Sequence, residues 1–305
     1  MELKFKTPKG LTLIELLIAV AISGILMAAI YRTFIGQHRA YTVQEQVVDM
    51  QQNARVAINR MMREIRMAGF GSVSSVLPNF TAIDGPFSNI INPSDNKNIV
   101  DGQVTDQVTI IGAFEQISTL ASEASPGTNT IQLTGKASEF DLVNKKYICI
   151  GGLETHTISN IDTVGNTITL NENLVNRFRV DPLDPLVPPV PIFKVKAITY
   201  QLRPDNRNPP MPVLTREDNT DGGGSQVVAE NIDNLQFRYV FEDGSESDSP
   251  ADPSRIRMVR VTVHARTSFS DLEFKSDPKY KVGEGGFRRR TISSNILVRN
   301  MGVTP

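Results

Sequence analysis

The pattern of apolar and polar positions divides the chain into a long helical region and a region rich in strands. Residues 11–31 are apolar or uncharged apart from Glu15, and 21 residues are enough for a helix to cross a bilayer. No proline follows until well after Gly69, a glycine of the kind that commonly ends a helix. We therefore expect one helix over residues 12–68, about 85 Å long at 1.5 Å per residue.

The second half of this helix is predicted to be amphipathic. Apolar or small residues recur there at intervals of three and four, which places them on one face. They are Ala40, Val43, Val47, Met50, Ala54, Ile58, Met61, Ile65 and Ala68. Charged residues fill the other faces. The first half, apolar all round, is expected in lipid or in a filament core, and the second half is expected to pack on a folded domain.

Beyond Gly71 the sequence changes to β-forming residues separated by turns. Alternation and β-branched content predict strands at 107–111, 130–133, 146–150, 155–161, 167–170, 193–202, 213–215, 235–241, 256–267 and 291–298. Residues 72–101 contain three prolines and several asparagines, and we interpret them as a loop. The proline-rich residues 181–191 either separate two domains or connect strands of one, and we favour the second interpretation.

These patterns predict an α+β fold in which a long N-terminal helix packs on a mainly antiparallel, β-rich head. We expect a leader at 1–10, a transmembrane or filament-core helix at 11–35, its amphipathic continuation at 36–70, and the exported head at 71–305.

Glu15 is the only charged residue between Gly10 and Arg32. A carboxylate inside an apolar helix is costly in a low-dielectric medium, so a cationic partner is the default hypothesis. Residues 1–10 carry three lysines against one glutamate. Cytoplasmic flanks of membrane helices favour lysine and arginine, so the N-terminus is expected in the cytoplasm and the head in the periplasm.

Residues 9–20, KGLTLIELLIAV, resemble the N-terminus of type IV prepilins and type II secretion pseudopilins. The resemblance implies that prepilin peptidase cuts after Gly10 and N-methylates Leu11. It also implies that Glu15, the fifth mature residue, pairs with the terminal amine of a neighbouring subunit during assembly. Leu11 departs from the usual phenylalanine. An uncleaved anchor is one alternative, and a secretory signal cut after Ala21 is another that Glu15 disfavours.

Later segments resemble PilW-type minor pilins and PulJ/GspJ-type pseudopilins. The similar segments are 51–55, 63–70, 228–232, 235–239 and 288–300. The resemblance implies a minor pilin that helps to initiate or assemble a type IV pilus at the cell surface. Its implied partners are prepilin peptidase, other minor and major pilins, the inner-membrane assembly platform and inner-membrane lipid. A type II secretion pseudopilin remains an alternative, as does a membrane-anchored adhesin or ligand-binding module.

Composition and motifs point away from several other classes. The net charge is −1, and loss of the leader's three lysines and one glutamate makes it −3, so no specific nucleic-acid binding is expected. Arginines at 55, 60, 63 and 66 could form such a patch, but acidic residues dilute it. No catalytic, phosphate-binding or dinucleotide motif is present, so we expect no enzyme and no cofactor.

Candidate metal and thiol sites are weak. The three histidines, His38, His156 and His264, are scattered, which disfavours a zinc site. Acidic residues at 243–252 could bind calcium, although a solvated loop is the simpler interpretation. The single cysteine, Cys149, lies in an apolar run and is expected to be buried, with an intermolecular disulfide as the alternative.

Overall fold

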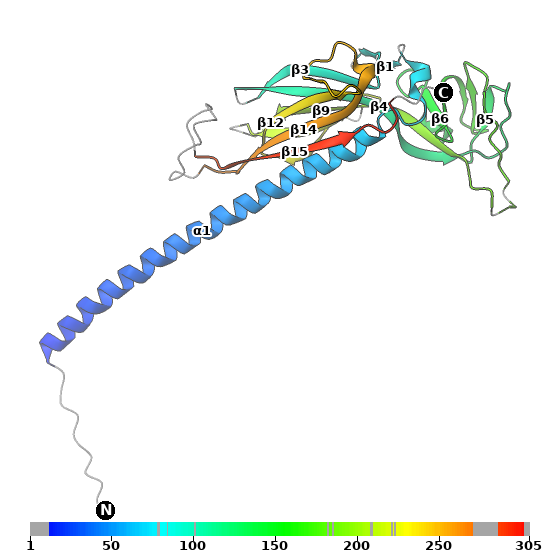
Figure 1. Cartoon of the computed structure of the whole chain (residues 1–305). Helices are drawn as coiled ribbons and strands as arrows, with labels where there is room; N and C mark the ends of the chain where they lie inside the picture. The colour runs from blue at the N-terminus through cyan, green and yellow to red at the C-terminus, as the bar shows by residue number, and fades with distance from the viewer. Residues whose placement is uncertain are drawn as a thin grey trace, which may run out of the picture. The chain divides into compact units, whose positions relative to one another are not determined.

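The structure, a computed structural model, describes residues 12–77, 80–83, 85–100, 102–181, 183–184, 186–207, 210–220, 222, 224–270 and 286–301. The chain forms two compact units, Met1–Asp49 and Met50–Pro305. One helix, α1 (Leu13–Met67), runs through the boundary between them, and the strands belong to the second unit (Figure 1). The predicted α+β class is confirmed.

Within the first unit, α1 exposes its apolar side chains on every side. From Leu13 to Phe34 each described side chain is exposed, so this segment has no intramolecular core of its own. The hydroxyls of Ser23 and Thr33 donate to the carbonyls of Ala19 and Ala29, one turn earlier, at 2.7 and 3.0 Å. Because these hydroxyls are satisfied within the helix, they are compatible with an apolar surrounding.

Within the second unit, the end of α1 packs on the head through the predicted apolar face. Met50, Ala54, Ile58, Met61 and Ile65 are buried, at the three- and four-residue spacing that the sequence predicts. Ala57, outside that predicted set, is also buried, which widens the packed face. Burial of this stripe supplies most of the stability of the second half of the helix.

A nine-stranded sheet forms most of the head. It contains β3 (Ile91–Val100), β4 (Gln103–Thr119), β5 (Thr130–Gln132), β6 (Tyr147–Ile150), β7 (Glu154–Asp162), β8 (Thr167–Leu170), β9 (Pro191–Pro204), β10 (Pro212–Asp218) and β11 (Ser225–Glu230). Strand β9 is its axis, since β4 pairs along one side and β10 and β6 pair successive segments of the other. Within the described residues, strand β11 pairs only with β10 and forms an edge.

Two smaller sheets complete the head. One contains β13 (Glu246–Ser247), β12 (Ile232–Phe241), β14 (Ile256–Arg266) and β15 (Arg289–Leu297), in that order, and the other is the hairpin of β1 (Phe80–Ala82) and β2 (Gly85–Phe87). Figure 1 shows β12, β14 and β15 side by side. Short 3₁₀ helices occur at Val73–Val76, Ala137–Glu139 and Pro253–Arg255. All strand pairs in the described part of the chain are antiparallel, as predicted.

Each predicted strand is present, but the predicted loop at 72–101 is wrong. It contains β1, β2 and the ten-residue β3, which pairs with β4. The Asp106 carboxylate accepts the backbone N–H of Asn96 at 3.0 Å, next to a register shift where Asn96 has a φ of +52°. An irregular strand rich in Asn, Asp and Pro is therefore held in place by a residue of its partner strand.

The proline-rich residues 181–191 lead from β8 into β9, two strands of the same nine-stranded sheet. One apolar core lies beside them and is built on β5, β6 and β8, with Ile148, Ile168 and Phe178 among its buried members. A second core surrounds Cys149 and Ile111 at the end of α1. The predicted domain boundaries at 35 and 70 are not tested by these contacts and stay predictions.

Candidate functional site

The predicted processing site lies at the N-terminal edge of the described residues. Gly10 and Leu11 fall outside them, so cleavage and N-methylation there stay predictions. Thr12 directly precedes α1, and the first acidic residue of the helix is Glu15. The structure therefore describes Glu15 and the start of the helix that carries it, while the assembly role of Glu15 stays a prediction.

Thr12 and Glu15 hold one another in a reciprocal capping arrangement. The Thr12 backbone N–H and hydroxyl both donate to Glu15 Oε2 at 2.9 Å. In return, the Glu15 backbone N–H donates to the Thr12 hydroxyl at 3.4 Å. This is the Thr-x-x-Glu capping box, a pattern that was visible in the sequence and that our sequence interpretation missed. The box orients the carboxylate at the first turn and leaves Oε1 with no partner among the described residues.

One described helix, α1, contains a window that is long and apolar enough to cross a membrane. None of that window is buried within the protein. Large apolar side chains exposed on every face are unfavourable in water, and lipid or neighbouring apolar helices remove this cost.

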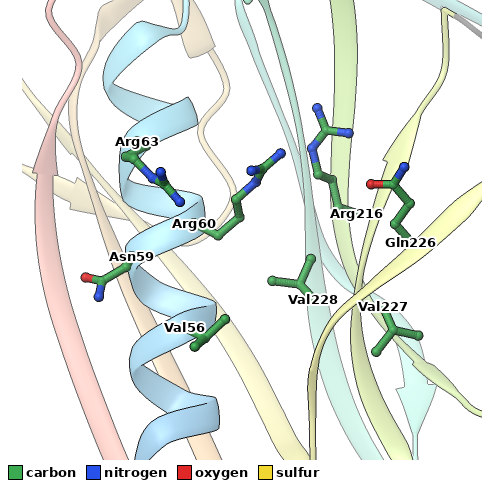
Figure 2. Close-up of a pocket in the computed structure, with 8 residues that line it drawn as sticks. All are labelled: Val56, Asn59, Arg60, Arg63, Arg216, Gln226, Val227 and Val228. Carbon is green, nitrogen blue, oxygen red and sulfur yellow. The ribbon is translucent and has the colours of Figure 1, made fainter.

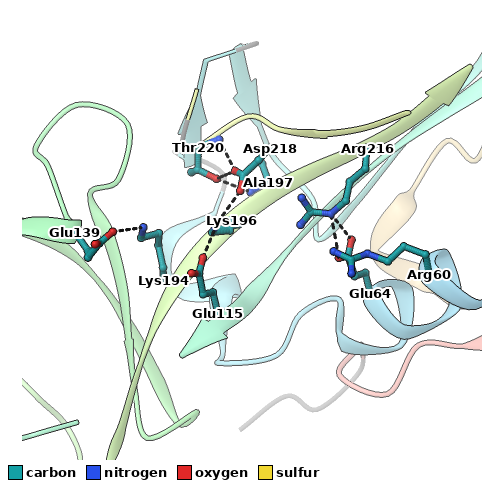
Figure 3. A network of polar contacts seen from close by, with 10 residues as sticks. All are labelled: Arg60, Glu64, Glu115, Glu139, Lys194, Lys196, Ala197, Arg216, Asp218 and Thr220. Atoms are coloured by element: carbon teal, nitrogen blue, oxygen red, sulfur yellow. Dashed lines mark hydrogen bonds and ion pairs between the residues drawn. The ribbon is translucent and has the colours of Figure 1, made fainter. Parts of the chain in front are cut away.

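A buried polar cluster fastens the end of α1 to the sheet (Figure 3). The Glu64 carboxylate of α1 accepts the Arg216 Nε–H of β10 at 3.0 and 3.1 Å and the Tyr200 hydroxyl of β9 at 2.7 Å. Arg60, one turn earlier on α1, lies 3.0 Å from the same carboxylate. The pKa of the Tyr200 hydroxyl is raised, mainly by burial and next by the charge of the facing Glu64 carboxylate. The hydroxyl therefore stays protonated and donates at neutral pH.

A second ion cluster in Figure 3 joins β4, β9 and β10. Lys196 Nζ lies 2.6 Å from a Glu115 oxygen and 2.7 Å from Asp218 Oδ2. Burial alone would raise the pKa of the Asp218 carboxyl, but Lys196 and the Thr220 donors outweigh burial and hold that pKa below its usual value. Lys196 and Asp218 therefore form an ion pair of two charged groups. Because the pair joins neighbouring strands, it is a structural contact.

The other candidate residues are not brought together. Among the described residues no three His, Cys, Asp or Glu side chains gather as metal ligands. His38, His156 and His264 bond to Thr42, Glu154 and Thr291 respectively, on separate elements.

The acidic residues at 243–252, the calcium candidate, are bonded to arginines and to backbone N–H groups within the loop. The Asp248 carboxylate accepts two hydrogen bonds from the Arg238 guanidinium, at 2.8 and 3.1 Å, and Asp243 forms an ion pair with Arg255 at 3.4 Å. Asp252 accepts the backbone N–H of Ser254. These contacts agree with the simpler interpretation, a solvated loop held by arginines.

Cys149 is fully buried in the described head. Burial raises the pKa of its thiol to about 11, in spite of donors from Thr155 and Gly152 that lower it. A buried, protonated thiol fits the interpretation of Cys149 as a small apolar residue better than an intermolecular disulfide.

Comparison with known families gives one match. Residues 6–31 match the family model described as the prokaryotic N-terminal methylation motif. Comparisons with curated proteins and with solved structures gave no match. The motif supports a type IV prepilin-like protein that prepilin peptidase processes, and the single apolar helix is consistent with membrane anchoring.

Proposed function

We propose that this chain is a minor pilin, of the PilW type, that takes part in the initiation or assembly of a type IV pilus. The observation that carries the proposal is Glu15: an oriented carboxylate at the first turn of an apolar helix that has no intramolecular packing. The match of residues 6–31 to the methylation motif supports the same conclusion.

In lipid, the Glu15 carboxylate needs a cationic partner. Cleavage after Gly10 creates an ammonium at Leu11, and both charges are costly in a low-dielectric medium unless they pair. Thr12 occupies Oε2 of Glu15, so Oε1 remains available to the ammonium of a neighbouring subunit. Stacking of subunits with a small axial offset would pair every Glu15 carboxylate with an amine, and this attraction of opposite charges would stabilise the assembly.

The remaining features support the proposed location and partners. The leader lysines favour a cytoplasmic N-terminus and a periplasmic head before assembly. After assembly, the proposed location is a pilus at the cell surface. Prepilin peptidase, the inner-membrane assembly platform, and other minor and major pilins are the proposed partners. A mature chain of 295 residues, 305 less 10, has a bulky head that would be hard to repeat along a thin fibre. We also propose that the head is not an enzyme.

A pseudopilin of a type II secretion system is the second candidate, since it would use the same processed N-terminus. An anchored adhesin or ligand-binding module is the candidate from another class. A simple anchor needs no charged residue in its helix. Glu15 distinguishes this third candidate from the first two.

The test replaces Glu15 by Ala or Gln in the single chromosomal copy. We expect the Glu15→Ala chain to reach the membrane and lose assembly, measured as surface filaments and as this protein in sheared filament fractions. Thr12→Val is the matched control, because it removes the two capping contacts of the Thr12 hydroxyl, leaves the backbone N–H contact and keeps the Glu15 charge. Normal piliation and normal type II secretion with Glu15→Ala would contradict an assembly role. Loss of secretion alone would favour the pseudopilin.

A further inference from the structure

A groove of about 510 Å³ lies between the end of α1 and the strands β10 and β11, inside the compact unit Met50–Pro305. Figure 2 shows the eight residues that line it, from three separate segments of the chain. They are Val56, Asn59, Arg60, Arg63, Arg216, Gln226, Val227 and Val228.

The groove carries an excess of positive charge. Three guanidinium groups line it, and the nearest carboxylate, Glu64, lies between two of them, 3.0 Å from both Arg60 and Arg216. Arg63 pairs with no carboxylate of the described residues and is exposed. Three cationic groups against one anionic group leave an excess of two positive charges, which matches a ligand with two carboxylates.

Part of this charge is held in a fixed geometry. The Arg216 side chain is only 11% exposed, and Glu64 fixes it through the Nε–H. Arg60 is 41% exposed and reaches toward Arg216 across the groove (Figure 2). Guanidinium groups that are oriented before binding lose less rotamer freedom when a carboxylate arrives.

The groove also exposes aliphatic surface. Val56 on α1 and Val227 on β11 are 51% and 57% exposed, one on each side. Strand β11 is an edge of the nine-stranded sheet, and in the described part of the chain it pairs with β10 alone. Arginine beside aliphatic surface is typical of protein interfaces, whereas a phosphate backbone would leave the valines uncovered.

We propose that this groove is a docking site for a segment of another polypeptide that carries two acidic side chains next to aliphatic ones. The carboxylates pair with Arg63 and Arg60, and the aliphatic side chains cover Val56 and Val227. Arg216 supplies a fixed positive charge at the end of the groove where Gln226 lies. This inference goes beyond the proposed function, because it would hold equally for an anchored head that never enters a filament.

The test places a photo-crosslinking amino acid at Val227, and separately at Gln226, in the full chain in its native cells. After irradiation, the crosslinked peptides are identified by mass spectrometry of the membrane fraction. We expect a segment with at least two Asp or Glu residues beside aliphatic ones. Arg63→Glu should lower the yield at least about ten-fold, as expected for reversal of a charge that pairs at an interface.

Arg55→Glu is the matched control, since Arg55 is an exposed arginine of the same helix that does not line the groove. It makes the same charge change and should leave the yield unchanged. Replacing the identified acidic residues by lysine should restore crosslinking to the Arg63→Glu chain.

Four results would overturn the proposal: equal yields for the Arg63 and Arg55 variants, a crosslinked segment without acidic residues, adducts with nucleic acid or lipid only, or no adduct from either probe position.

Discussion

Glu64 of α1 and Arg216 of β10 are 152 positions apart in the chain and form a nearly buried ion pair, with Arg216 Nε 3.0 and 3.1 Å from the two carboxylate oxygens. The Tyr200 hydroxyl donates to the same carboxylate at 2.7 Å. The end of the helix is therefore fixed to the centre of the sheet by polar contacts as well as by its apolar face. This fixed connection also orients one wall of the arginine-lined groove.

Removal of Glu64 is expected to be costly. The Arg216 side chain is only 11% exposed, and Glu64→Gln removes its counter-charge. Loss of one partner of a buried ion pair costs about 3 kcal/mol of unfolding free energy. Arg60→Gln is the control, because Arg60 is 41% exposed and its pair should be worth less than about 1 kcal/mol. Urea unfolding of the full chain in detergent measures both. Equal effects of the two substitutions would contradict the role given to Glu64.

Gly71 is expected to tolerate no side chain. Its φ is +91°, and an added Cβ would lie 2.6 Å from Cys149 Sγ and 2.9 Å from Ala113 Cβ. Gly71→Ala should therefore lower the unfolding free energy by about 1–3 kcal/mol more than the positive φ alone would.

Gly127→Ala is the matched control for Gly71, since Gly127 has a φ of +82° and no atom within 4 Å of the added Cβ. Adding Cys149→Ala to Gly71→Ala should recover part of the loss, because it removes the nearest clashing atom. Thermal melts of the natural chain and of these three variants compare the effects, and equal losses at Gly71 and Gly127 would show that the predicted clash is absent.

The Cys149 thiol is expected to be inert in the folded chain. Its pKa of about 11 and its complete burial leave very little accessible thiolate at pH 8, and the thiolate is the reactive form. Labelling with a thiol reagent should be at least about a hundred times slower in the native chain than in denaturant. Fast labelling of the native chain, or a dimer lost on reduction, would return weight to an intermolecular disulfide.

The Lys196–Asp218 pair predicts a specific pH dependence. The pKa of Asp218 is held below its usual value, so the pair contributes stability above about pH 3.9, and this contribution is lost as the pH falls through the folded-state pKa. Asp218→Asn should therefore be less stable than the natural chain at pH 6, and the difference should shrink below about pH 3.9. Urea unfolding of both chains across this range measures it. A difference that stays constant with pH would contradict the charged pair.

The parts of the fold that were predictable are those in which local pattern and tertiary environment agree. The amphipathic half of α1 repeats every three to four residues, and β14 alternates, so each buries the side predicted from its own sequence. Strand β3 was missed because its sequence, INPSDNKNIV, has few β-forming residues and depends on pairing with β4 and on the Asp106 carboxylate. That support comes from outside the segment.

The candidate sites divide in the same way. The Gly10, Leu11 and Glu15 spacing lies within six residues and can be recognised in the sequence directly, and processing there stays a prediction. The Thr12 capping box, which is also local, could have been predicted from the sequence. The arginine-lined groove could not be predicted, because the fold brings Arg216 beside Arg60 across more than 150 residues. From the sequence, Arg60 is assigned to the amphipathic helix, whereas Arg216 lies just past a predicted strand and has no assigned role.

Processing after Gly10 and assembly through the apolar helix is the proposed route of this chain into a filament. Mass spectrometry of the N-terminus, in sheared surface filaments and in membranes, tests it most directly. We expect a chain in the filament fraction that begins at N-methylated Leu11, while processed chain in membranes alone would favour a secretion pseudopilus. A chain that begins at Met1 or at Ile22 in both fractions would contradict the claim.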